Sequence, residues 1–220
     1  MIRLFNIYQY AIPLVLFPVS YLLWLGRFDG NHKLVLLALS LPVIFAYVVP
    51  GIGTNLLGLW EINTRFRLGK FRPHHGFVFG TATSLFALLC VPPVVSSNLL
   101  EVVRSGFVLG SVLAFWNWLY DIYAIKAGFI LVYTQKSQQN LGAEAIATDY
   151  APVLFGVFGM CYGVTIRLFE QVLLQLGRWD LYWILFLGSN LVGVTAPVIA
   201  FVCCSYLRNG VTGLKPHTGG

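Results

Sequence analysis

The residue best suited to chemistry is Asp121, an acid within the apolar stretch 105–134, which contains no proline. Asn117 precedes it by one helical turn and shares its helix face. An ionisable group inside a membrane is costly, so it points to a function. Beside aromatic rings, which stabilise cations, this acid could protonate an alkene or an epoxide, or it could relay a cation or a proton. The residues expected to form the substrate site around it are Trp60, Trp116, Asn117, Trp118, Tyr120 and Tyr123. The alternative is an interfacial aromatic belt, with Asp121 at the end of a span.

Glu61 is the second candidate acid, because it directly follows Trp60 at the end of another apolar run. It could face the same cavity as Asp121 and assist catalysis. Alternatively, it is a loop carboxylate that pairs with Arg65, four residues further on.

The loop that follows carries the densest positive cluster of the chain: Arg65, Arg67, Lys70 and Arg72. Such a cluster could bind a phosphate or diphosphate headgroup. It could also serve only to fix the membrane topology. Further along, Arg167 and Glu170 lie three residues apart and are expected to pair as surface charges of an interfacial segment.

The elements that position these residues are membrane-spanning helices. Hydrophobic residues make up 58% of the 220 residues and charged residues only 10%, with a mean hydropathy of +0.77. Soluble domains carry about 25% charged residues, so the bilayer is the solvent of this chain. The net charge of +6 lies in short loops, where anionic membrane lipids rather than nucleic acid explain it.

Apolar runs predict an all-α, polytopic membrane bundle with one transmembrane domain, 1–207, and a short polar tail, 208–220. Pro50-Gly51 predicts a kink in the second helix. An even number of spans places both termini on one side, and the larger number of Lys and Arg residues on that side favours the cytoplasm. The predicted spans are 7–25, 34–60, 76–95, 106–133, 151–170 and 181–207.

Two glycine pairs share a GxxxG frame, Gly76/Gly80 and Gly106/Gly110. Glycines four residues apart make a flat helix face on which another helix packs closely. These faces are therefore expected to pack against a helix of this chain or of a partner.

No cofactor or metal site is expected. The four histidines include one adjacent pair and the four cysteines lie in apolar segments, without the spacing of a zinc, haem or di-iron site. Nucleotide-binding and hydrolase motifs are also missing from the sequence.

A small all-helical membrane protein with Trp60-Glu61 at the end of its second helix, and with a second intramembrane acid, resembles the small membrane-bound terpene cyclases. That resemblance implies acid catalysis on an isoprenoid. In that family the second acid lies in the last helix, whereas here the last predicted helix, 181–207, carries no acid.

Two functions stay open at this stage. The first is a non-redox membrane enzyme, of the cyclase or isomerase kind, that acts on an apolar lipid or isoprenoid in an aromatic-lined pocket. The second is a small transporter or an accessory subunit without catalytic activity.

Overall fold

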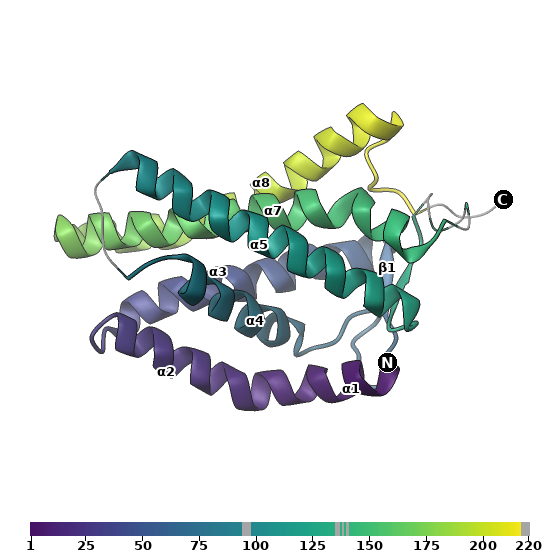
Figure 1. Cartoon of the computed structure of the whole chain (residues 1–220), viewed down its shortest axis with the longest axis horizontal. Coiled ribbons are helices and arrows are strands. Elements are labelled where there is room, and N and C mark those ends of the chain that lie inside the picture. The colour runs from purple at the N-terminus through teal and green to yellow at the C-terminus, as the bar shows by residue number, and fades with distance from the viewer. Residues whose placement is uncertain (94–97, 135–136, 138, 140, 217–220) are drawn as a thin grey trace.

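The computed structural model describes residues 1–93, 98–134, 137, 139 and 141–216, and within them it shows an all-α membrane bundle (Figure 1). This confirms the predicted fold class. A further helix, α4 (His75–Cys90), is apolar but shorter than the roughly 20 residues that a span needs. The helices long and apolar enough to cross a membrane are Ile2–Arg27, His32–Leu56, Leu99–Lys126, Ala143–Gln175 and Trp179–Asn209.

The first two long helices each contain a π-helical turn beside a proline. The first consists of α1 (Ile2–Ala11), the π-turn η1 (Ile12–Leu16) around Pro13, and α2 (Phe17–Arg27). The second is α3 (His32–Gly51), followed by the π-turn η2 (Ile52–Leu56). Proline removes a backbone donor, and π-turns accommodate such interruptions. The interruption predicted at Pro50-Gly51 therefore takes the form of a π-turn directly after it.

A two-stranded antiparallel sheet closes one end of the bundle. Strands β1 (Trp60–Ile62) and β2 (Ile130–Val132) pair with Trp60 opposite Val132. The sequence predicts β2 within the helix 106–133, Trp60 at the end of the helix 34–60, and Glu61 and Ile62 in the loop after it. The structure corrects this, because Gly58 and Gly128 adopt positive φ angles of 63° and 66° and end the helical path before each strand.

The remaining long helices are α5 (Leu99–Lys126), α7 (Ala143–Phe169) and α8 (Tyr182–Asn209). The π-turn η3 (Glu170–Gln175) extends α7, and a 3₁₀ turn, η4 (Trp179–Leu181), precedes α8. Helix α7 starts before the predicted boundary at residue 151, so residues expected in a loop belong to it. The first residues of the predicted tail fold back onto the end of α8, where the Ser205 hydroxyl donates to the Val211 carbonyl at 2.9 Å.

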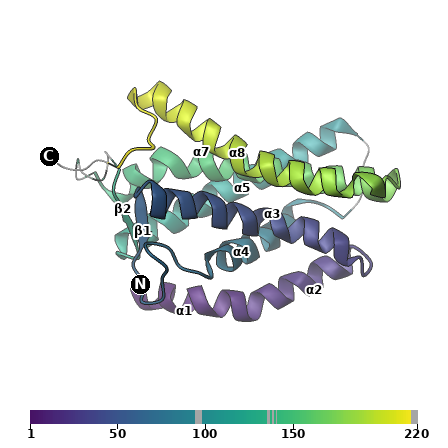
Figure 2. The same ribbon diagram turned by 180° about the vertical axis from the view of Figure 1, so that it is seen from behind.

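Helices α5 and α7 form the closest helix pair, and they lie side by side in Figures 1 and 2. A Cβ atom at Gly159 would meet the Gly110 Cα at 2.7 Å, and one at Gly163 would meet the Ser105 carbonyl oxygen at 2.6 Å. The other predicted pair, Gly76 and Gly80 on α4, packs against side chains of α3, Tyr47 and Val43. The glycine faces predicted from the sequence are therefore covered by helices of this same chain.

The bundle has two distinct ends (Figure 1). The sheet end carries β1, β2, the start of α1 and the end of α8. The far end carries the turn between α2 and α3 and the turn between α7 and α8. A large core of buried apolar side chains, including Leu37, Leu41, Leu109 and Ile166, fills the bundle between them.

Candidate functional site

A large cavity opens among the helices at the sheet end. Its volume is about 1160 Å³, which exceeds the 300–1,000 Å³ of ordinary ligand pockets. Most of its wall is apolar, with side chains such as Phe45, Val49, Phe79, Leu113 and Phe155 from α3, α4, α5 and α7. The space is therefore suited to a bulky apolar molecule.

The polar residues of the cavity wall come from separate elements, each close to the sheet in the chain or in space. Arg72 and His75 lie where the loop after β1 enters α4, and Tyr120 and Asp121 lie in the last turns of α5 before β2. The polar lining residues at this end include Tyr8, Arg72, His75, Asn117, Tyr120, Asp121 and Tyr150. Others come from the segment after β2, from α7, and from the end of α8 and the tail: Thr134, Gln139, Asp149, Ser205, Asn209, Thr212 and Lys215. The cavity thus has a polar end and an apolar body.

Asp121 is buried and lines the cavity, with only 6% of its surface exposed. The hydroxyl of Tyr150, in the second turn of α7, donates a hydrogen bond to its Oδ2 at 2.7 Å. Among the described residues no cation pairs with Asp121. Asn117 lines the same wall, and its amide group donates to the Leu113 carbonyl of its own helix at 2.9 Å.

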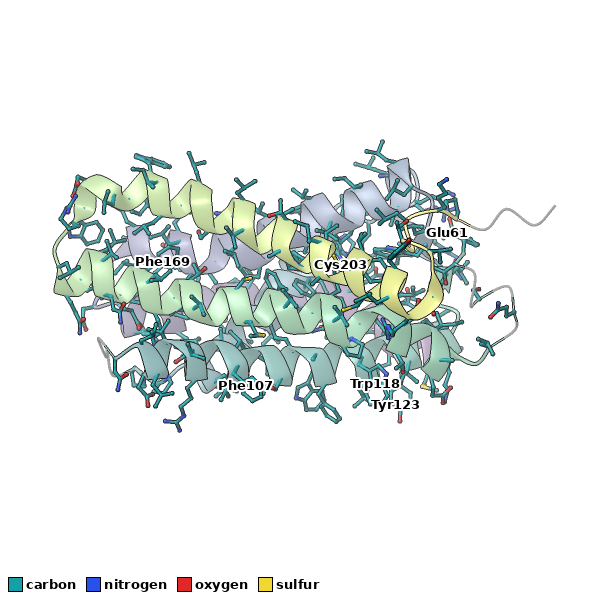
Figure 3. All side chains as sticks on the ribbon, turned by 90° about the horizontal axis from the view of Figure 1, so that it is seen from above. Glu61, Phe107, Trp118, Tyr123, Phe169 and Cys203 are labelled. Carbon is teal, nitrogen blue, oxygen red and sulfur yellow. The ribbon has the colours of Figure 1, made fainter. Side chains whose placement is uncertain are left out.

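The aromatic residues predicted around Asp121 divide into two groups. Trp60, Trp116 and Tyr120 line the cavity. Trp118 and Tyr123 lie on the outer side of α5 (Figure 3), where Trp118 donates to the Thr148 hydroxyl at 2.9 Å and Tyr123 is 45% exposed. An α-helix presents one stripe to a cavity, so a run of neighbouring aromatic residues cannot all face it.

The structure does not place Glu61 beside Asp121. Successive residues of a strand point to opposite faces, and in β1 both Trp60 and Ile62 line the cavity. Glu61 instead accepts a hydrogen bond from the Tyr133 hydroxyl at 2.7 Å and lies 3.4 Å from Arg67. Burial and this carboxylate raise the pKa of Tyr133 to about 12.

Of the four basic residues of the loop, only Arg72 enters the cavity wall. Arg65, Arg67 and Lys70 are exposed, whereas Arg72 is only 3% exposed. Its Nε donates to His75 Nδ1 at 3.0 Å, and its Nη1 donates to Gln9 Oε1 at 3.3 Å.

Arg72 has neutral surroundings. Its guanidinium lies 5.6 Å from the centre of the Phe129 ring, and among the described residues no carboxylate forms an ion pair with it. Burial lowers the pKa of Arg72, and the neighbouring hydroxyls of Tyr120 and Tyr8 partly offset this effect. The Tyr120 hydroxyl is itself buried and lies beside the guanidinium, which can donate to its oxygen.

A second group of buried charges lies at the far end. Glu170 accepts hydrogen bonds from Arg27 at 2.6 Å and from Arg167 at 2.7 Å, and all three side chains are at most 6% exposed. Arg27 also donates to the backbone carbonyls of Val91 and Pro92, where α4 has ended. The surface pair expected from the sequence is therefore a buried cluster that satisfies non-helical backbone inside the bundle.

Sequence reasoning missed three residues of the site. Tyr150 directly precedes the predicted span 151–170, His75 is one of the adjacent histidine pair, and Tyr8 has no distinguishing signal in an apolar run. The close grouping of Arg72, His74 and His75 was the one available signal for the polar end. Within the described residues, no group of three His, Cys, Asp or Glu side chains is placed to hold a metal ion.

No protein-family model, curated protein or solved structure matches this chain.

Proposed function

We propose that this protein is a membrane-embedded enzyme that isomerises or cyclises an apolar lipid of the isoprenoid kind by acid catalysis at Asp121. The observation that carries the proposal is a buried carboxyl group in the wall of a large apolar cavity, with no cation bonded to it among the described residues. A charged carboxylate without a cation is costly at low dielectric, which favours the neutral acid that can donate a proton.

In this mechanism Asp121 protonates a carbon–carbon double bond or an epoxide oxygen of the substrate. The hydrogen bond from Tyr150 to Oδ2 orients the carboxyl group and leaves Oδ1 to carry the proton. The π faces of Trp116, Tyr120 and Trp60 stabilise the carbocation. Loss of a proton from a neighbouring carbon to the Asp121 carboxylate ends the reaction. Substrate and product then have the same atoms, and no oxidant or reductant is needed.

The direct test is turnover in D₂O by the purified protein in lipid nanodiscs, with a panel of isoprenoid alkenes and epoxides. An alkene product that carries one carbon-bound deuterium identifies proton donation from an exchangeable acid, whereas turnover of an epoxide is followed by its rearranged product, because a hydroxyl deuterium exchanges with the solvent. We expect Asp121→Asn to lower the rate by about 10²-fold or more, since it removes the proton but keeps an acceptor for Tyr150. The matched control is Glu101→Gln on the same helix, an acid that pairs with Arg104 away from the cavity.

Full turnover by Asp121→Asn would contradict the mechanism. Glu61→Gln sharpens the same test: with Glu61 on the other face of β1, we expect an unchanged rate. If the panel yields no product but Asp121→Asn abolishes proton-dependent uptake of a lipid into vesicles, the transporter alternative replaces the enzyme.

The location proposed for this activity is a membrane with the sheet end on the cytoplasmic side. The loop after β1 carries Arg65, Arg67 and Lys70, exposed at this end, and positive loops remain in the cytoplasm. A cysteine placed at Arg67 in a cysteine-free background tests the orientation. We expect it to react with a membrane-impermeant thiol reagent only after the cells are opened.

A further inference from the structure

The cavity also contains a buried positive charge that acid catalysis does not use. Arg72 is only 3% exposed and sits in the cavity wall at the polar end. A buried ion is normally paired with an opposite charge, because desolvation is too costly otherwise. Within the described residues Arg72 has only neutral hydrogen-bond partners, so its charge is solvated but not balanced.

The position of Arg72 is held from several sides, which distinguishes it from a mobile surface arginine. Gln9, which is fully buried, binds Asn6 and Thr64 through its Nε2 and keeps its Oε1 for Arg72. His75 accepts from Arg72 through Nδ1, so its proton lies on Nε2. The fold thus fixes a guanidinium in place before any ligand arrives.

Further hydrogen-bond donors surround this charge. The Tyr120 hydroxyl is buried beside the guanidinium, which can donate to its oxygen, and its own proton meets no acceptor among the described residues. Tyr8 approaches from α1, with its ring 5.8 Å from that of Tyr120. A guanidinium together with tyrosine hydroxyls forms a donor set for carboxylate or phosphate oxygens.

We propose that Arg72, with Tyr120 and Tyr8, binds the anionic head group of the substrate, a phosphate or a carboxylate, while its apolar chain fills the cavity past Asp121. This inference rests on the proposed function for the identity of the chain as a substrate. The binding step itself needs no turnover. The proposed ligand is therefore an amphiphile with one negatively charged end.

The test uses three probes with the same farnesyl chain: farnesyl phosphate, farnesoic acid and farnesol. Binding to the purified protein in nanodiscs is followed by the fluorescence of Trp60 and Trp116, which line the cavity. We expect at least one anion to bind about tenfold or more tightly than the alcohol, since charge-assisted hydrogen bonds are the strong ones. The comparison of farnesyl phosphate with farnesoic acid shows which head group is preferred.

Arg72→Met should remove the preference for the anion and leave the affinity for farnesol within about twofold. Arg67→Met is the matched control, because Arg67 lies in the same loop but is exposed, and it should keep the full preference. Arg72→Lys retains a charge, so it should keep a reduced preference. This variant serves as the test if Arg72→Met does not fold.

Three outcomes would overturn the inference. The first is equal affinity of the wild-type protein for farnesol and both anions. The second is equal behaviour of Arg72→Met and Arg67→Met, and the third is competition by inorganic phosphate alone at the concentration at which farnesyl phosphate binds. Asp121→Asn separates this inference from the proposed function. If that variant keeps both the anion preference and full turnover, only the catalytic role fails. If it loses turnover but the wild type shows no preference, only the anion site fails.

Discussion

The two ends of the bundle handle buried charge in opposite ways. At the far end, Arg27 and Arg167 share the carboxylate of Glu170, and the ion pairs connect α2 to α7. At the sheet end, Arg72 and Asp121 are just as buried, but within the described residues neither has an ion partner. Charges that balance each other hold helices together, whereas charges left unbalanced around a cavity are available to a ligand. Burial alone therefore does not distinguish the two ends of the bundle; the presence or absence of a counter-charge among the described residues does.

The largest effect is expected from Glu170→Gln. It leaves two buried guanidiniums without their shared carboxylate, which should cost about 3–5 kcal/mol in the free energy of unfolding. The same change at the sheet end, Asp121→Asn, should cost less than about 1 kcal/mol, because no ion pair is lost. Thermal unfolding in detergent micelles compares the two variants directly. Similar destabilisation by both would remove the distinction between the ends.

Gly159→Ala is expected to lower the free energy of unfolding by an intermediate amount, and the effect should not be confined to one end of the bundle. The new Cβ would lie 2.7 Å from the Gly110 Cα and 2.9 Å from the Leu109 carbonyl oxygen, so α5 and α7 must move apart. Overpacking of this kind costs about 1–3 kcal/mol, seen as a lower unfolding temperature. The matched control is Gly188→Ala in α8, where a Cβ would meet nothing within 4 Å. Destabilisation by the control instead would show that the close contact is not what matters.

The smallest effect is a pH dependence at the sheet end. Burial and the charge of Arg72 lower the pKa of His74 from its ordinary value of 6.5. Below pH 6.5, His74 takes up a proton more readily in the unfolded chain than in the folded chain. The free energy of unfolding should therefore fall as the pH decreases through 6.5. His74→Gln should reduce this slope, and so should Arg72→Met, which removes part of the cause. An unchanged slope in both variants would show that Arg72 does not raise the local potential.

The sequence was sufficient for the fold class, and it selected several of the residues that the structure places in the cavity wall. Apolar runs predict long helices well because the bilayer demands them, and Asp121, Trp116 and Arg72 could be selected from residue type alone. The strands escaped prediction, since each has only three residues and begins two residues after a glycine at the end of an apolar run, which resembles the end of a helix. Once β1 is a strand, Glu61 must point away from Trp60, so the prediction of two acids in one cavity depended on a helix that does not extend that far.

The sequence also could not predict which charged side chains are buried and which are exposed. Arg167 and Glu170 have the spacing of a surface pair, and only their contact with Arg27, far away in the chain, makes them a buried cluster. Arg72 looks like its neighbours Arg67 and Lys70. It differs because Gln9 and His75, on two other elements, hold it inward. Such differences arise from tertiary contacts between distant segments.

The small sheet also sets the depth of the site in the membrane. Each of its two strands has an outer edge whose backbone groups need water or protein partners, so β1 and β2 belong near the water boundary rather than in the hydrocarbon. Asp121 lies five residues before the end of α5 at Lys126, about 7.5 Å along the helix axis at about 1.5 Å per residue. The acid is then shallow with respect to the bilayer and yet enclosed by protein. An amphiphile could keep its charged end at the level of the lipid headgroups, as it does in the free membrane, and only its chain would have to leave the lipid.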